Sequence, residues 1–239
     1  MLELKNISYT VQNELGEKTI LKDINLTIGE RFVAFTGPNG GGKSTLAKVI
    51  AGIIKPTSGS IYFNGEDITD LSVTERAHKG ISYAFQQPVR FKGLTVRDLI
   101  NIAAGKTLKV SDACAYLSEV GMCARDYIDR EVNASLSGGE LKRIEIATIL
   151  ARGTSLSVFD EPEAGIDLWS FGNLIKVFEK MHEKTQGNIL IISHQERILN
   201  IADKIVVIAD GTVREQGKKD EILPKLLGKE ACKILTDKL

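Results

Sequence analysis

A glycine-rich stretch that ends in a lysine and two hydroxyl residues has the composition of a loop that binds phosphate. The apolar run 32–35 before it indicates a buried strand, and residues 46–51 after it indicate a helix that ends at Gly52. Glycines let the backbone curl so that its N–H groups point at an anion, and a helix N-terminus adds partial positive charge. This phosphate loop consists of Gly37, Pro38, Asn39, Gly40, Gly41, Gly42, Lys43, Ser44 and Thr45.

Three side chains at the end of the phosphate loop have separate expected roles. Lys43 is placed to reach the β- and γ-phosphates of a nucleoside triphosphate, and the Ser44 hydroxyl to ligate Mg²⁺. Thr45 can donate to an inner phosphate. A glycine-rich turn that binds nothing is the alternative, but the strand before the loop and the helix after it favour phosphate binding.

Two adjacent carboxylates, Asp160 and Glu161, end a second apolar run, residues 156–159. Asp160 at a strand end can hold Mg²⁺, directly or through water. Glu161, one residue beyond, can act as the base or the orienting group for an attacking water. Many strands end in acids, so this pair indicates a catalytic site only because a phosphate loop precedes it in the same chain.

A second helix start also has the composition of an anion site. The signature segment, residues 136–140, places two glycines before the strong helical pattern of residues 141–151. Its N–H groups can bind an anion, which predicts a composite site closed by the loop of one subunit and the helix start of another. The residues concerned are Ser137, Gly138, Gly139 and Glu140.

These stretches together resemble an ABC-family ATPase cassette over essentially the full length of the chain. The resemblance implies further roles for residues outside the stretches above. Gln86 matches the glutamine that contacts Mg²⁺ and water and responds to the partner, and Asp167 matches the residue that crosses the dimer interface. His194 matches the histidine that senses the γ-phosphate. The adenine-stacking position falls on Val11, with Tyr9, two residues earlier on the same strand face, as the alternative.

The resemblance therefore implies an ATPase that uses ATP and Mg²⁺. The expected catalytic residues are Lys43, Gln86, Glu161 and His194, and the expected metal ligands are Ser44, Gln86 and Asp160. The expected fold is α/β, a P-loop NTPase of ABC type with a mixed core sheet, an antiparallel β portion and a helical insertion. Residues 1–86 and 136–239 would form the ATP-binding core, and residues 87–135 the helical subdomain.

Three shorter runs are similar to the SufC subfamily, the ATPases of SUF-type iron–sulfur cluster assembly: residues 84–89, 136–143 and 193–199. Gln195 follows His194 where transporter cassettes commonly carry an aspartate. The resemblance implies ATP-dependent self-association and a SufB-like scaffold partner that docks near residues 88–100. Two alternatives stay open: the ATP-binding subunit of a membrane transporter, and an interaction module whose slow hydrolysis only resets binding.

Composition narrows the remaining possibilities. Lysine plus arginine equals aspartate plus glutamate at 31 each, which disfavours a nucleic-acid partner. No run of eighteen apolar residues and no signal-peptide pattern is present, so we expect a cytoplasmic protein without direct membrane insertion. Cys114, Cys123 and Cys232 lack metal or redox spacing, and we expect buried thiols.

Overall fold

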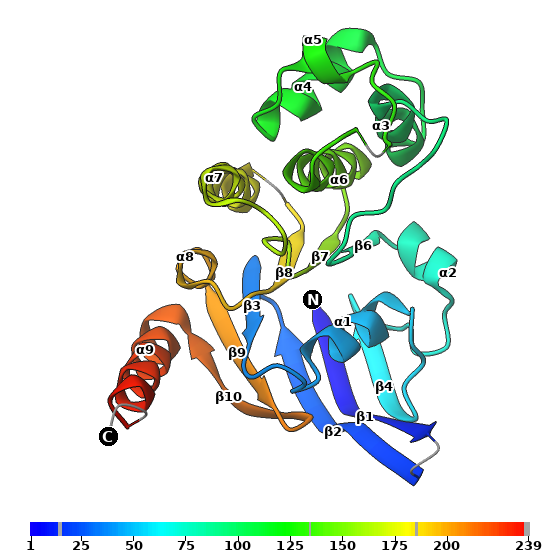
Figure 1. Ribbon diagram of the computed structural model, residues 1–239. Coiled ribbons are helices and arrows are strands. Elements are labelled where there is room, and N and C mark those ends of the chain that lie inside the picture. The colour runs from blue at the N-terminus through cyan, green and yellow to red at the C-terminus, as the bar shows by residue number, and fades with distance from the viewer. Residues whose placement is uncertain (14–15, 134, 185, 237–239) are drawn as a thin grey trace. The chain divides into compact units, whose positions relative to one another are not determined.

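Two compact units make up the chain in this computed structural model (Figure 1), which describes residues 1–13, 16–133, 135–184 and 186–236. The first unit contains Met1–Arg76 and Leu190–Leu239, and the second contains Ala77–Ile189. The chain passes between them within helix α2 (Val73–His78) and strand β8 (Asn188–Ile192).

An antiparallel sheet with the strand order β2-β1-β4-β5 forms one part of the first unit. Its apolar residues alternate with polar ones, so Leu2 and Leu4 are buried on one face of β1. The runs at residues 19–21 and 24–28 are typical of two separate strands, but the structure has one long strand with Asp23 at φ 48°. The strands are β1 (Leu2–Asn13), β2 (Gly16–Ile28), β4 (Ser58–Phe63) and β5 (Glu66–Asp67).

The strand before the phosphate loop lies in a second sheet of this unit. Strand β3 is buried along its whole length and pairs in parallel with β9, which pairs antiparallel with β10. An Asp-Gly pair between two runs typical of strands predicts a hairpin at Asp210 and Gly211. These two residues form the turn between β9 and β10, both with positive φ. The elements are β3 (Phe32–Thr36), α1 (Lys43–Ala51), α8 (Glu196–Leu199), β9 (Lys204–Ala209), β10 (Thr212–Lys218) and α9 (Lys219–Thr236).

The second unit combines a parallel strand pair with a group of helices. Strand β6 pairs in parallel with β7, and helices α3 and α4 pack on α6 (green in Figure 1). Thr95 with Asp98 three residues later predicts a capping box at a helix start, and this capping box begins α3. The elements are β6 (Ile81–Ala84), α3 (Val96–Ala104), α4 (Val110–Glu119), α5 (Ala124–Tyr127), α6 (Gly138–Arg152), β7 (Leu156–Asp160) and α7 (Leu168–Lys184).

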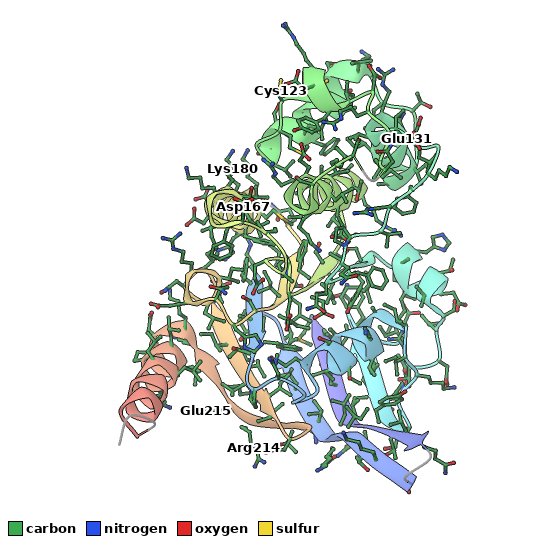
Figure 2. All side chains as sticks on the ribbon, in the orientation of Figure 1. Cys123, Glu131, Asp167, Lys180, Arg214 and Glu215 are labelled. Atoms are coloured by element: carbon green, nitrogen blue, oxygen red, sulfur yellow. The ribbon has the colours of Figure 1, made fainter. Side chains whose placement is uncertain are left out.

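Helices α3, α4 and α5 all fall within residues 87–135, the predicted helical subdomain. The compact second unit also includes β6, α6, β7 and α7, so the subdomain boundaries stay a prediction. The cysteine prediction was wrong: Cys123 is exposed beside α5 (Figure 2) and Cys114 is half-buried, while the side chain of Cys232 lies outside the described residues. Cys123 precedes a helix of only one turn, which covers little surface.

Candidate functional site

The phosphate loop has a backbone path that only glycine permits at its beginning. Gly37 has φ 126°, and a Cβ there would lie 2.1 Å from the carbonyl oxygen of Ile208. A Cβ on Gly41 would lie 2.8 Å from the same oxygen. Since real side chains do not come this close, the loop can pack against β9 only with glycine at these two positions.

The turn between β9 and β10 supports the phosphate loop through backbone hydrogen bonds. The Gly211 amide donates to the Gly41 carbonyl at 3.0 Å, and the Lys22 amide donates to the Gly211 carbonyl at 2.8 Å. The loop is thereby tied through one residue to strand β2. The sequence predicted only a hairpin at Asp210 and Gly211. It could not predict the contact of Gly211 with Gly41, because the two residues are 170 positions apart and a local pattern does not indicate so distant a neighbour.

The first turn of α1 has no side-chain cap. Its N-cap is Gly42 at φ 104°, which has no side chain to fill the space before the helix or to cap its first amides. Lys43 is 4% exposed, and its ammonium donates to the carbonyls of Gly37 at 2.7 Å and Pro38 at 2.9 Å. The loop thus holds a buried cation beside a helix N-terminus, a charge arrangement that fits a triphosphate.

Tyr9 and Val11 both lie on β1 and are half-buried. Tyr9 pairs with Leu21, and the Leu21 side chain fills the space where a Cβ of Gly42 would sit, at 2.9 Å. Val11 pairs with Lys18, further along the strand. Tyr9 is therefore one strand away from the phosphate loop, and a contact of either residue with adenine stays a prediction.

His194 follows β8 in the first unit and is exposed. The preceding Ser193 is fully buried, and its amide donates to the carbonyl of Phe35 at 3.1 Å, on the strand that leads into the phosphate loop. The Ser193 hydroxyl accepts from the Gln195 amide at 3.0 Å and so fixes the turn that carries His194. The contact of His194 with a γ-phosphate stays a prediction.

The acid pair in the second unit is held by two residues that end or follow β6. Asp160, 4% exposed, accepts a hydrogen bond from the Tyr83 hydroxyl at 2.6 Å. Burial is the main cause that raises the pKa of Tyr83 well above its ordinary value of 10.0, and the hydrogen bond to Asp160 is the second. The phenol therefore stays protonated and donates. The Gln86 amide donates to the carboxylate of Glu161 at 2.7 Å. The structure thus brings Gln86 and Glu161 together.

Glu161 adopts a left-handed backbone conformation with φ 44°. Residues other than glycine rarely do so, and such strain at a site is retained when the surrounding structure and the function require it. The turn directs the Glu161 side chain to Gln86, while the preceding Asp160 completes β7. This feature could not be read from the sequence.

The signature segment begins α6 with a capping box. The Ser137 hydroxyl accepts from the Glu140 amide at 3.3 Å, and the Glu140 carboxylate accepts from the Ser137 amide at 2.6 Å. The capping box therefore uses the backbone amides of Ser137 and Glu140. It does not use the backbone amides of the two residues between them, Gly138 and Gly139. Ser137 and Gly138 are exposed, as an intermolecular contact requires.

Asp167 lies just before α7, where Figure 2 labels it, and its carboxylate accepts from the Ser170 amide at 2.9 Å. Gly165 of the same loop lies beside the signature segment, because its carbonyl is 3.5 Å from where a Cβ of Gly138 would be. The two stretches expected to face a second subunit, the signature segment and the Asp167 loop, are neighbours in the second unit.

A buried ion pair connects α6 to the residue before Gln86. Lys142 is 1% exposed, and its ammonium donates to the Phe85 carbonyl and, at 2.8 Å, to Glu145. The Phe85 amide donates back to Glu145 at 3.2 Å. Burial raises the pKa of Glu145 above its ordinary 4.5, and Lys142 acts in the opposite direction. Sequence analysis missed this pair because Lys142 and Glu145 read as surface residues of an amphipathic helix.

Comparisons with known proteins identify the family. Residues 21–164 match the profile of the family described as ABC transporter. The chain belongs to this family. It is 40% identical over 216 residues to an uncharacterized ABC transporter ATP-binding protein, MJ0035, of Methanocaldococcus jannaschii, covering 87% of this chain and 86% of the relative. It is also 34% identical to the probable ATP-dependent transporter ycf16 of Antithamnion sp., covering 92% of each chain.

The fold of this ABC cassette is also that of solved cassettes. The dimeric MJ0796 cassette in a post-hydrolysis state, bound to ADP and Pi, superimposes with a TM-score of 0.81 at 26% identity, covering 92% of this chain and 99% of that one. The cbiO1 protein of Clostridium perfringens gives a TM-score of 0.76 at 27% identity, covering 93% and 90%. The predicted P-loop fold of ABC type is confirmed.

As a member of this family, the chain is an ABC ATP-binding subunit and an ATPase that uses ATP and Mg²⁺. The phosphate loop, Tyr9, Val11 and His194 belong to its first unit, and the remaining predicted site residues belong to the second. Among the described residues, no group of three or more His, Cys, Asp or Glu side chains is placed to hold a metal ion. No helix within the described ranges is long and apolar enough to cross a membrane.

Proposed function

We propose that this cassette dimerises on ATP and uses hydrolysis to change the conformation of a SufB-like scaffold on which an iron–sulfur cluster is assembled. The observation that carries a partner-coupled role is the exposed surface that directly follows Gln86. Val89 and Phe91 are 49% and 42% exposed, and Arg90 and Lys92 between and beside them are also exposed. An apolar pair with flanking cations is typical of a protein interface.

The backbone of this surface is fixed while its side chains face solvent. The Phe91 amide donates to the Val132 carbonyl at 3.1 Å, and the Gly93 amide donates to the Glu131 carboxylate at 2.7 Å. A partner that contacts Phe91 would therefore meet a preformed surface, and its movement would reach Gln86 through only four residues of chain. We propose that residues 88–100 form the docking segment.

The proposed mechanism is in-line attack of water on the terminal phosphate. Lys43 neutralises charge on the phosphates. Ser44, Gln86 and Asp160 would hold Mg²⁺, which would supply further positive charge there when bound. Glu161, held by the Gln86 amide, accepts or orients the proton of the attacking water.

His194 is the proposed contact of the γ-phosphate. Ser137, Gly138 and Gly139 of a second copy, followed by its Asp167, would close the site. An ATP-bound pair is favoured because ATP binds the closed dimer preferentially and shifts the population toward it.

The membrane transporter is the second candidate function, and the names of several relatives favour it. The sulfate/thiosulfate import protein CysA 1 of Rhizobium meliloti is 33% identical over 89% of this chain, which spans only 63% of that relative. The scaffold proposal is supported by Gln195 after His194 and by the runs at residues 84–89, 136–143 and 193–199. The catalytic assignments are the same under both candidates.

An anaerobic pulldown in mild detergent from the native source separates the candidates. The bait is the full chain, compared with the variant Arg90→Glu/Lys92→Glu and with a control that reverses two exposed charges elsewhere, Lys18→Glu/Lys106→Glu. We expect a soluble protein carrying iron and acid-labile sulfide that is lost only from the docking variant. A multispanning membrane protein without iron would move the chain to the transporters. Equal capture by both variants would contradict the docking segment.

A further inference from the structure

Arg76 is the largest fully buried side chain among the described residues, and its guanidinium is surrounded by backbone carbonyls. Nη1 donates to the carbonyls of Val49 at 2.7 Å and Ile50 at 2.8 Å, and Nη2 donates to that of Thr69 at 2.9 Å. Nε donates to the Leu71 carbonyl at 3.2 Å. Burial lowers the pKa of this group, and Asp67 and Asp70 act in the opposite direction.

The first two of these carbonyls belong to the last turn of α1, the helix that begins at the phosphate loop. A cation at a helix C-terminus satisfies carbonyls that have no partner in the helix and complements the helix dipole. Arg76 therefore fixes the far end of the helix whose N-terminus carries Lys43. A rigid helix of nine residues transmits the position of one end to the other.

Gly52, the C-cap of α1, is adapted to this contact. It has φ 78°, and a Cβ there would lie 2.9 Å from Cδ and 3.0 Å from Nε of Arg76. The glycine C-caps of α3 and α6, Gly105 and Gly153, have similar φ angles of 67° and 64°, but nothing lies within 4 Å of a Cβ built on either. The lack of space for a Cβ at Gly52 is therefore due to the Arg76 side chain, and it is not a general property of a glycine C-cap.

The residue after Arg76 is Ala77, the first residue of the second unit, and contacts within that unit hold it. Nη2 of Arg152, the last residue of α6, donates to the Ala77 carbonyl at 2.9 Å, and the Gly80 amide donates to the same carbonyl at 3.0 Å. Helix α6 begins at the signature segment. Two consecutive residues of α2 therefore bind the last turns of the two helices that begin at the phosphate loop and at the signature segment.

We propose that Arg76 and Arg152 are positioning residues for ATP hydrolysis, which act through α2. Arg76 sets the position of the phosphate loop through α1, and Arg152 ties the signature helix to the same short segment. Displacement at one helix is then carried to the other through the peptide bond between Arg76 and Ala77. The inference rests on the phosphate-loop and signature assignments of the proposed function.

The test measures ATP affinity without Mg²⁺ and steady-state hydrolysis with Mg²⁺, on full-length variants that circular dichroism shows to be folded. We expect Arg76→Lys, which keeps the charge but loses the planar fork, to raise the Kd for ATP by at least about threefold. Gly52→Ala should do the same, and its matched control Gly105→Ala should not. If both variants lose thermal stability but keep the wild-type Kd, Arg76 is only structural and the proposal is wrong.

The coupling is tested by a double-mutant cycle. Arg152 is exposed, so Arg152→Gln should fold normally, keep the Kd for ATP and lower kcat, whereas Arg125→Gln, an exposed control, should change neither. In Arg76→Lys/Arg152→Gln the loss in kcat/KM should be smaller than the product of the single losses, because one break already uncouples α2. A loss equal to the product would overturn the relay.

Lys43→Ala separates this inference from the function on which it rests. Retained ATP binding in Lys43→Ala would mean that the phosphate loop is wrongly assigned. Lost binding in Lys43→Ala, together with unchanged ATP affinity in Arg76→Lys, would overturn only the positioning role.

Discussion

The side-chain amide of Gln86 donates a hydrogen bond to the carboxylate of Glu161 at 2.7 Å, although the two residues are 75 positions apart in sequence. Glu161 reaches this partner from a left-handed backbone conformation. The proposed base and the residue proposed to respond to a partner are therefore one hydrogen-bonded unit. We therefore expect that movement of the proposed docking segment after Gln86 would change the orientation of the Glu161 carboxylate.

Replacement of Glu161 by glutamine should separate binding from turnover. The amide keeps the shape of the side chain but cannot accept a proton, so we expect ATP binding to persist and kcat to fall at least about a hundredfold. Equilibrium ATP binding and phosphate release measure the two quantities. Size-exclusion chromatography with light scattering should then show an ATP-stabilised dimer. Hydrolysis at a wild-type rate would contradict the role of Glu161.

A second carboxylate beside Glu161 should break its contact with residue 86. Gln86→Glu removes the amide that donates to Glu161 and replaces it with a like charge, so the two side chains repel. Because Glu161 then loses its orientation, we expect kcat to fall, as measured by steady-state phosphate release. Gln87→Glu adds the same charge at the neighbouring exposed residue and should leave kcat unchanged. A fall of equal size in both variants would show a general charge effect.

The Tyr83 hydroxyl should tune the proposed metal ligand Asp160. Tyr83→Phe removes the 2.6 Å hydrogen bond, and loss of such a supporting partner typically weakens metal affinity by about tenfold or more. We expect the Mg²⁺ concentration for half-maximal ATPase activity to rise accordingly. Tyr116→Phe, which removes a hydroxyl from α4, is the control. Unchanged Mg²⁺ dependence in Tyr83→Phe would remove this role.

Removal of one partner from the buried pair of Lys142 and Glu145 should lower the free energy of unfolding. Lys142→Met leaves Glu145 without its cation, and we expect the free energy of unfolding to fall by about 3–5 kcal/mol. Lys142→Met/Glu145→Gln removes the uncompensated charge and should recover part of this loss. Urea denaturation of the two variants measures the difference. Equal destabilisation would show that the contact with Phe85, and not the charge, matters most.

The capping box at the signature segment should make stability depend on pH. Burial alone raises the pKa of Glu140, but hydrogen bonds from Tyr127 and Ser137 outweigh it and hold the pKa below 4.5. Stability from a lowered pKa is complete above the unfolded value of 4.5 and is lost as pH falls through the folded value. Urea denaturation should therefore show a steeper loss of stability below about pH 5 in the wild type than in Glu140→Gln.

The sequence by itself determined the local features of this protein. Strand β3, the phosphate loop and α1 could be predicted because glycine spacing and apolar runs specify them within a few residues of chain. The capping box at Thr95 and the Asp210–Gly211 hairpin were predicted for the same reason. Motif order then indicated the ABC fold, which the comparisons confirmed.

Only the tertiary structure decided which distant residues meet. Tyr83 with Asp160, Lys142 with Phe85 and Arg76 with the end of α1 join segments whose separation in sequence carries no periodic signal. The sequence does not distinguish a buried lysine or arginine from a solvated one. The role of the side chain depends on the carbonyls and carboxylates that folding places around it. Long-range packing, which removes these groups from water, determines their partners.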